Sequence, residues 1–144
     1  MNVLVTGGAG FIGSHLVDSL VKRGHKVLVV DNLSTGHGRN VNTKCLVDLM
    51  DLSDTRLHSL ISSFRPKAVF HLAGQVSVSN SFENPNDTIR QNVVNTLRLM
   101  QHSADLAVQY FSFASSSAVY GESGVNQTEQ DQTNPSSPYG LSKL

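Results

Sequence analysis

Several features that would place a chain in a specialised class of protein are scarce or missing from these 144 residues. The 11 basic and 11 acidic side chains cancel, so no basic surface for nucleic acid is expected. The single cysteine, Cys45, cannot form an internal disulfide, which fits a reducing cytoplasm, and we expect it to be a small buried side chain. No apolar run is long enough for a signal peptide or a membrane span. The histidines and acids show no metal-ligand spacing, so we expect no metal.

What the chain does contain is an alternation of short apolar runs with amphipathic stretches, in a composition that is 39% hydrophobic and predicts one globular domain. The pattern predicts strands at 3–6, 26–30, 45–47, 68–72 and 110–114, and helices at 11–22, 54–64 and 85–107. On the first helix we expect Phe11, Ile12, Leu16, Leu20 and Val21 near one face, and on the last Ile89, Val93, Leu97 and Met100. This alternation implies an α/β fold with a doubly wound parallel sheet.

The end of the chain is polar and then helical in pattern. Residues 121–138 are polar and predict a long surface loop, and loops of that length in compact domains usually have a function. Residues 138–144 look like the first turns of a helix that begins with a proline. We expect the chain to be the N-terminal piece of a longer protein, although a naturally short domain with a frayed tail remains the alternative.

The most informative segment is the glycine cluster that follows the first predicted strand. Gly8, Gly10 and Gly13 form a G-x-G-x-x-G pattern between a strand and a helix, where bare backbone N–H groups and the helix dipole suit a phosphate. Such a pattern alone is weak, because glycine turns are common. Asp31 ends the second predicted strand about 20 residues later, where a dinucleotide-binding fold places an acid for the ribose diol. The combination predicts nucleotide binding.

Two groups of hydroxyl and amine side chains are candidates for a catalytic site. Tyr139 and Lys143 are four residues apart and share one helix face, where an ammonium favours a phenolate that can exchange a proton with a sugar hydroxyl. Judged by this spacing alone, an ordinary pair of surface side chains on a helix is the stronger interpretation than a catalytic pair. Ser115, Ser116 and Ser117 follow the fifth strand, at the ligand-binding edge of such a sheet, or else form an ordinary serine-rich turn.

Four further positions leave alternatives open. Leu72–Gly74 end a strand with small residues, either to approach a ligand or simply to turn. His71 is more readily a packed core residue than a base. Asp51 either holds an adenine amino group or caps the helix near residue 54. Asn92 is either a solvated amide or one that faces a cofactor.

Together these residues resemble the extended short-chain dehydrogenase/reductase family, and most closely its NAD-dependent nucleotide-sugar epimerases of the UDP-glucose 4-epimerase type. The resemblance rests on the blocks at 6–13, 30–36, 51–54, 71–74, 92–93, 115–121 and 137–143, in that order. It implies a Rossmann-type parallel sheet with helices on both faces, truncated at residue 144 before a C-terminal substrate-binding lobe. One departure is Gln91–Asn92, where many epimerases carry two asparagines, and it puts a Gln91 contact in doubt.

The resemblance also implies a site. The NAD pyrophosphate would be lined by Gly7, Gly10, Phe11, Ile12 and Gly13. The adenosine ribose would be held by Asp31 and Asn32, with Ser34, Thr35 and Gly36 nearby, and the adenine by Asp51 and Leu52. The nicotinamide side would be lined by Leu72, Ala73 and Gly74. Ser116, Tyr139 and Lys143 match the catalytic triad, with Ser116 chosen because it lies three residues before Val119. Because Asp31 would repel a 2′-phosphate and no arginine stands beside it in the sequence, we expect NAD rather than NADP.

The implied reaction is the inversion of a sugar carbon on a UDP-sugar through a 4-keto intermediate. Tyr139 would take the proton of the 4-hydroxyl, Lys143 would favour its phenolate and anchor the nicotinamide ribose, and Ser116 would bond the same oxygen. The hydride would pass to NAD and return to the other face of the sugar. Other readings are a decarboxylase, a uronate epimerase, a non-catalytic NAD-binding scaffold, or a 4,6-dehydratase, whose acid pair is replaced here by Ser117-Ala118. By analogy, the long helix at 85–107 would form a homodimer.

Overall fold

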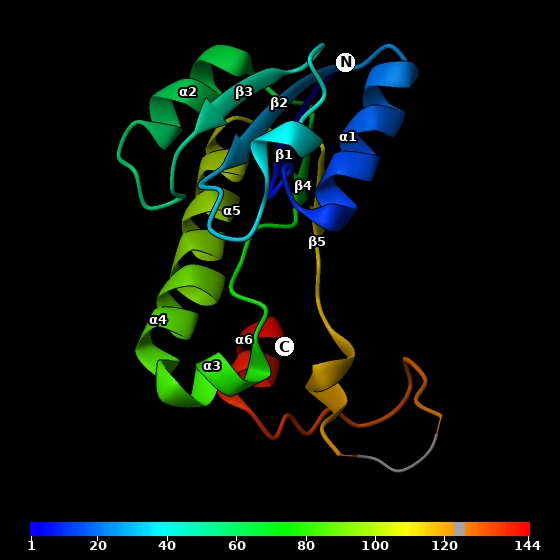
Figure 1. The fold of residues 1–144 in the computed structure, drawn as a ribbon, viewed down its shortest axis with the longest axis vertical. Helices are drawn as coiled ribbons and strands as arrows, with labels where there is room; N and C mark the ends of the chain where they lie inside the picture. Colours follow the sequence, from blue (N-terminus) through cyan, green and yellow to red (C-terminus); the bar gives the residue numbers. More distant parts are fainter. Residues whose placement is uncertain (123–125) are drawn as a thin grey trace. The chain divides into compact units, whose positions relative to one another are not determined.

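A five-stranded parallel sheet forms the centre of the computed structural model, which describes residues 1–122 and 126–144. The strands are β1 (Asn2–Thr6), β2 (Lys26–Asp31), β3 (Leu46–Leu49), β4 (Ala68–His71) and β5 (Tyr110–Phe113). Their order in space is β3-β2-β1-β4-β5, and every neighbouring pair is parallel (Figure 1). The chain winds outward from β1 to β3 and then returns to β4 on the other side. This reversal confirms the doubly wound, Rossmann-type α/β fold.

The sheet belongs to a compact unit formed by Met1–Ala73 and Leu97–Phe113. Helix α1 (Phe11–Lys22) covers one face, whereas α2 (Leu57–Phe64) and α5 (Asn95–Asp105) cover the other (Figure 1). Each face has its own apolar cluster. On the α1 side, Val17 and Leu20 pack with Val3, Val5, Val27, Val29 and Ala68. On the other side, Leu57, Ile61 and Leu99 pack with Leu4, Leu28, Val30 and Val69.

Burial on both faces explains why β1 and β2 are continuous apolar runs rather than alternating ones. Val3, Leu4 and Val5 are completely buried, and the apolar residues of β2 are almost so. Strands of this kind position whatever follows their carboxyl ends, because their own side chains have no freedom to move. The loops after β1, β2 and β4 therefore start from fixed points.

The apolar face expected for α1 is wrong at its first turn. Phe11 is 81% exposed and Ile12 is 68% exposed, whereas Gly13, Val17 and Leu20 face the sheet. The helix has the predicted bounds and ends as predicted, with Gly24 at φ +78° directly after the C-cap residue. Phe11 and Ile12 directly follow the glycine turn, and neither belongs to the apolar clusters on the two faces of the sheet.

A second compact unit is formed by Gly74–Thr96 and Ala114–Leu144. It contains α3 (Val78–Glu83), α4 (Pro85–Ile89), the π-helical turn η2 (Arg90–Val94), the 3-10 helix η3 (Ser117–Tyr120) and α6 (Pro138–Lys143). Helix α6 packs against α3, α4 and η3. We did not predict α3 or η3; the one available signal for α3 is Ser77, whose side chain accepts a hydrogen bond from the Asn80 N–H.

The helix predicted at 85–107 contains an irregular turn, because the π turn η2 separates α4 from α5. The apolar residues expected on one face of this helix are not its buried positions. Ile89, Leu97 and Met100 are exposed, and the buried positions include Asn92 and Leu99. A π turn adds one residue to the helical repeat and so rotates everything after it relative to an uninterrupted pattern. Hydrophobic spacing that assumes 3.6 residues per turn cannot detect this shift.

The remaining differences concern element ends. Helix α2 begins at Leu57 rather than 54, because the Asp54 side chain and carbonyl accept the N–H groups of Arg56 and Leu57 in a turn. A short 3-10 helix, η1 (Gly38–Asn40), interrupts the loop after β2. The described residues of the polar segment 121–138 form no strand and no helix before α6; residues 123–125 of the predicted loop lie outside the described residues.

The described part of the chain lacks two features. None of its helices is long and apolar enough to cross a membrane. Residues 1–122 and 126–144 also contain no group of three or more histidine, cysteine or acidic side chains arranged to hold a metal ion. Cys45 is only partly buried, and its thiol donates a hydrogen bond to the Asn42 carbonyl.

The histidine pair between α2 and α5 predicts an acid sensitivity of folding. The His58 and His102 rings lie 4.8 Å apart. The pKa of His102 is lowered from 6.5, chiefly by burial and then by the nearby His58, and Asp105 partly opposes this shift. A base whose pKa is lowered by folding costs stability as the pH falls below its unfolded value. Between pH 7.5 and pH 5, we expect the melting temperature of His102→Gln to fall by less than that of the wild type. His37→Gln, at an exposed loop histidine, is the control; equal losses in all three proteins would contradict the assignment.

Candidate functional site

The glycine turn between β1 and α1 brings backbone N–H groups to one point. Gly7 follows β1 and donates its N–H to the Val30 carbonyl of β2 at 2.9 Å, and Gly10 donates to the Gly7 carbonyl at 3.1 Å. Gly10 is the N-cap residue of α1, and it makes no side-chain cap. The first N–H groups of α1 therefore meet no capping side chain from this residue and suit an external acceptor such as a phosphate.

Two glycines of this turn are required by close packing. Gly7 has φ +72°, and a Cβ there would lie 2.7 Å from the Ala73 nitrogen and 2.8 Å from the Leu72 carbonyl carbon at the end of β4. A Cβ on Gly13 would overlap the Gly7 carbonyl oxygen. The turn is thus fitted between the end of β4 and the first turn of α1, and neither position has room for a side chain.

Asp31 ties the end of β2 to this turn. Its carboxylate is 8% exposed, and it accepts hydrogen bonds from the Ala9 N–H at 2.9 Å and from the Leu33 N–H at 2.8 Å. The sequence predicted an acid here for a ribose, and the structure shows that the same acid also shapes the loop around it. A carboxylate has about four acceptor positions, so these two bonds leave capacity for a ligand.

The residues after β2 and β3 meet at the same edge. Asn32 donates from its amide to Asp51 at 2.9 Å, and it accepts the Ser34 N–H at 3.0 Å. Asp51 also accepts both the N–H and the hydroxyl of Ser53. Asp51 therefore does not cap α2, which was one of its two interpretations. Leu52, expected beside an adenine, is buried in the apolar cluster on the α2 side.

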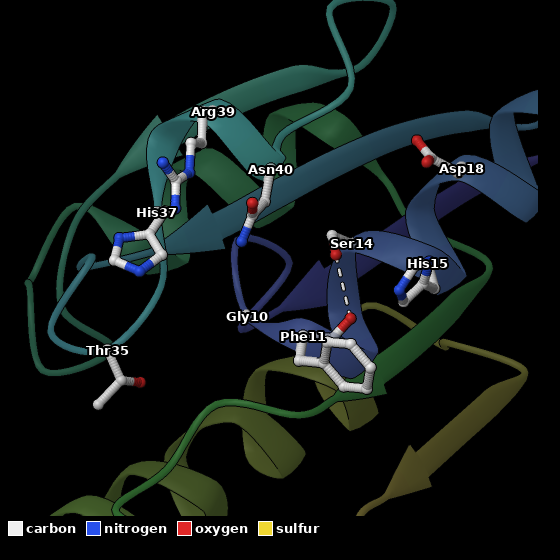
Figure 2. A pocket seen from close by; sticks show the side chains of 9 residues that line it. All are labelled: Gly10, Phe11, Ser14, His15, Asp18, Thr35, His37, Arg39 and Asn40. Atoms are coloured by element: carbon white, nitrogen blue, oxygen red, sulfur yellow. Dashed lines mark hydrogen bonds between the residues drawn. The ribbon is translucent and has the colours of Figure 1, made fainter.

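A hollow of about 600 Å³ opens beside the glycine turn. Figure 2 shows that helix α1 lines one side of it and the loop after β2 lines the other; the residues are Gly10, Phe11, Ser14, His15, Asp18, Thr35, His37, Arg39 and Asn40. His15, His37 and Arg39 give it basic groups, and the Asp18 carboxylate accepts the Asn42 amide. The hollow thus continues from Gly10 and Thr35, two positions that we predicted for the cofactor. Our sequence reasoning missed His37 and Arg39, although they directly follow the predicted 30–36 block.

In the second unit, Tyr139 and Lys143 lie on α6 and are 9% and 5% exposed. Ser137 caps this helix by accepting the Gly140 N–H at 2.9 Å. Burial lowers the pKa of Lys143 from its ordinary value of 10.5. The Lys143 Nζ lies beside Gly74, since it would be 3.4 Å from a Cβ built there. The structure thus brings Gly74 and Lys143 together within the second unit.

The three serines after β5 have different roles in the fold. Ser116, our predicted catalytic serine, is partly buried and caps η3 by accepting the Ala118 N–H at 3.2 Å. Ser115 donates its hydroxyl to the Lys143 carbonyl at 2.8 Å. Ser117 is exposed. Sequence reasoning gave no sign that Ser115 would bond the helix of Tyr139 and Lys143.

His71 and Asn92 were left with alternatives that the structure decides. His71 is 1% exposed, its Nδ1 lies 2.6 Å from the Thr6 hydroxyl, and it packs near Phe113, so it is a core residue as expected. Asn92 is 2% exposed and is therefore not solvated. Its side-chain amide bonds the Gln75 backbone and Ser142 rather than standing free for a ligand.

The doubly wound sheet, the glycine turn after β1 and the acid at the end of β2 define a dinucleotide-binding type of domain. Comparison with known sequences agrees. A sequence model of the NAD dependent epimerase/dehydratase family matches residues 3–144, and the chain belongs to that family.

The relatives and solved structures similar to this chain carry one recurrent name. The UDP-glucose 4-epimerase of Mycolicibacterium smegmatis is 39% identical across the whole chain, which covers 48% of that protein, and that of Lactobacillus helveticus is 41% identical, with 44% covered. The crystal structure of the Thermotoga maritima UDP-glucose 4-epimerase with UDP-glucose matches this structure with a TM-score of 0.94 and is 42% identical in sequence. The match includes 99% of this chain and 48% of the Thermotoga chain. The Thermus thermophilus enzyme in complex with NAD also has a TM-score of 0.94, at 41% identity. The chain spans about half the length of the relatives it matches.

The crowding at Gly7 can be measured against a second glycine of similar conformation. Gly24 has φ +78°, but a Cβ there would meet nothing within 4 Å. Gly24→Ala should therefore cost about 1 kcal/mol of unfolding free energy for backbone strain alone, whereas Gly7→Ala should cost about 2–4 kcal/mol because it also overpacks β4. Denaturant unfolding of both variants measures the difference. Equal costs would show that the turn does not depend on its approach to β4.

Proposed function

We propose that the full-length protein is an NAD-dependent nucleotide-sugar epimerase that interconverts UDP-glucose and UDP-galactose. The observation that carries the proposal is the buried pair Tyr139 and Lys143 on α6, with the Lys143 ammonium beside Gly74. A phenol and an amine held in this way suit proton transfer with a sugar hydroxyl. The similar proteins named UDP-glucose 4-epimerase support the choice of substrate.

The residues of the first unit fit NAD. The glycine turn has no room for side chains, the α1 N-cap residue supplies no capping side chain, and Asp31 retains acceptor capacity. Those that would hold the cofactor are Gly7, Gly10, Phe11, Ile12 and Gly13 for the pyrophosphate, Asp31 and Asn32 with Ser34, Thr35 and Gly36 for the adenosine ribose, and Asp51 and Leu52 for the adenine. Leu72, Ala73 and Gly74 would lie on the nicotinamide side. The Thermus thermophilus structure in complex with NAD supports this assignment.

The residues of the second unit would provide the proton chemistry. When bound, NAD supplies a reversible acceptor for the hydrogen on the sugar carbon that is inverted. Tyr139 would take the proton from the 4-hydroxyl and later return it. Lys143 would favour the phenolate form of Tyr139 by its positive charge and would bond the cofactor ribose. Ser116 would donate a hydrogen bond to the same sugar oxygen.

The length and the surface of the chain support three further proposals, on a second lobe, a homodimer and a cellular location. Because its relatives are about twice as long, we propose that a second lobe supplies most of the contacts to the sugar. Leu97 and Met100 are 60% and 47% exposed on α5, and we propose that this helix forms a homodimer. The single, unbridged cysteine fits a cytoplasmic enzyme.

Replacing the phenol tests the proposed reaction. Tyr139→Phe in the full-length protein should lower the conversion of UDP-galactose to UDP-glucose by about 10³-fold or more, since it removes the acid–base group. NAD affinity, measured by fluorescence titration, should change little. Tyr110→Phe is the control, because Tyr110 is 65% exposed on β5. Unchanged conversion by Tyr139→Phe would contradict the mechanism.

The choice of NAD over NADP is attributed to the Asp31 carboxylate. Asp31→Asn removes the charge that would repel a 2′-phosphate, so the preference for NAD should fall by about tenfold or more. Titration of the full-length protein with each dinucleotide measures this ratio, and Asp105→Asn, on α5, is the control. If the ratio of NAD to NADP affinity stays at the wild-type value, Asp31 is not the residue that discriminates between the two cofactors.

A further inference from the structure

The hollow beside α1 carries basic side chains on both of its sides. Arg39 and His37 come from the loop after β2, and His15 comes from α1 (Figure 2). Within the described residues, the acids that form ion pairs are Asp54 and Asp87, and neither of them pairs with Arg39. The charge of the Arg39 guanidinium is therefore not used in an ion pair of the described chain.

The acid among the described lining residues is already engaged. The Asp18 Oδ1 accepts the Asn42 side-chain amide at 2.7 Å. Arginine keeps its charge at every ordinary pH, and an imidazole acquires its charge between pH 8 and pH 5. An anion placed beside imidazoles also favours their charged form. The hollow thus becomes more positive as the pH falls, and a bound anion would strengthen that change.

The loop that carries Arg39 is fixed against the glycine turn. Gly36 is buried, and a Cβ there would lie 3.0 Å from the Ala9 Cβ. The Ala9 carbonyl accepts the His37 N–H at 3.1 Å and the Asn40 side-chain amide at 3.0 Å. Because these contacts already order the loop, an anion that binds to it does not bear the cost of ordering it.

The hollow extends away from the positions predicted for the adenosine. It shares Gly10, Phe11 and Thr35 with the predicted cofactor residues, whereas the adenosine positions 31–32 and 51–52 are not among the residues that line it. From Gly10 its lining continues along α1 for about two turns. Its volume of about 600 Å³ is in the range of small-molecule sites. A small ligand in this hollow would therefore leave the adenosine positions free for a dinucleotide.

We propose that this hollow is a binding site for a phosphate group, separate from the dinucleotide site, with Arg39, His37 and His15 as the groups that bind it. The guanidinium offers a fork of N–H donors that matches two phosphate oxygens. The Phe11 ring is exposed and lies 5.1 Å from the His15 ring, centroid to centroid, so a small metabolite that carries the phosphate has an aromatic wall to contact. This site goes beyond the proposed epimerase reaction and does not depend on it.

Removing the arginine tests the site. Isothermal titration calorimetry of the full-length protein with ribose 5-phosphate, in a phosphate-free buffer, should show binding. Arg39→Gln should weaken that binding by about tenfold or more, because a charge-assisted hydrogen bond is lost. Arg23→Gln is the matched control, since Arg23 is also exposed but lies at the C-terminal end of α1, outside the hollow. Equal affinities in all three proteins, or no binding by the wild type, would overturn the proposal.

The imidazoles are tested with sulfate, because sulfate stays a dianion from pH 8 to pH 6 and phosphate does not. Its affinity for the wild type should rise by about threefold or more over this range as the imidazoles gain charge. The double variant His15→Gln/His37→Gln should lose the rise and keep the dependence on Arg39. A rise that persists in the double variant would overturn the assignment of these two histidines.

Competition separates this site from the cofactor site. Inorganic phosphate, ribose 5-phosphate and ribose are each titrated with and without saturating NAD. Both phosphates should bind in either condition, with affinities that NAD changes by less than about threefold, and ribose should not bind. Tighter binding of ribose 5-phosphate assigns a phosphorylated metabolite to the site, and equal binding assigns the free anion.

Two results of the competition have different meanings. Loss of phosphate binding when NAD is bound would overturn the proposal, because the hollow would then belong to the cofactor site. A protein that binds phosphate in the hollow but converts no UDP-sugar would contradict the epimerase function alone.

Discussion

The close approach of the glycine turn to the end of β4 is the constraint on which the cofactor half of this structure depends. Gly7 can stand within contact of the Ala73 nitrogen only because it has no side chain. That approach fixes where α1 begins and therefore where its first N–H groups point. Asp31 holds the same turn from the β2 side through the Ala9 N–H. The turn is thus held from two strands at once.

The parts of this arrangement that the sequence predicted are those encoded by local rules. The glycine pattern predicts the turn because glycine alone tolerates both the positive φ and the crowding, and the apolar runs predict β1 and β2 because both faces of the sheet are covered. The Tyr139 and Lys143 spacing predicts a shared helix face, and Pro138 predicts the start of that helix. Each of these signals lies within a few residues of the feature it predicts.

The parts that could not be predicted depend on contacts distant in sequence or on irregular backbone. Nothing near Asn92 in the chain indicates a π turn, and the spacing of apolar residues over 85–107 does not show which positions are buried. Phe11 and Ile12 continue the apolar pattern of α1, but they are exposed, and the pattern alone does not show this. The bond from Asn92 to Ser142 spans 50 residues. Such pairings arise from packing and leave no periodic trace in the sequence.

The most direct measurement of the central claim follows the hydrogen on the sugar carbon. In the proposed reaction Tyr139 moves only the hydroxyl proton, while the carbon-bound hydrogen would pass to NAD and return to the same carbon. Full-length protein given UDP-galactose deuterated at carbon 4 should yield UDP-glucose that keeps the deuterium at carbon 4. Loss of the deuterium to water, or no conversion by protein that has bound NAD, would contradict the account.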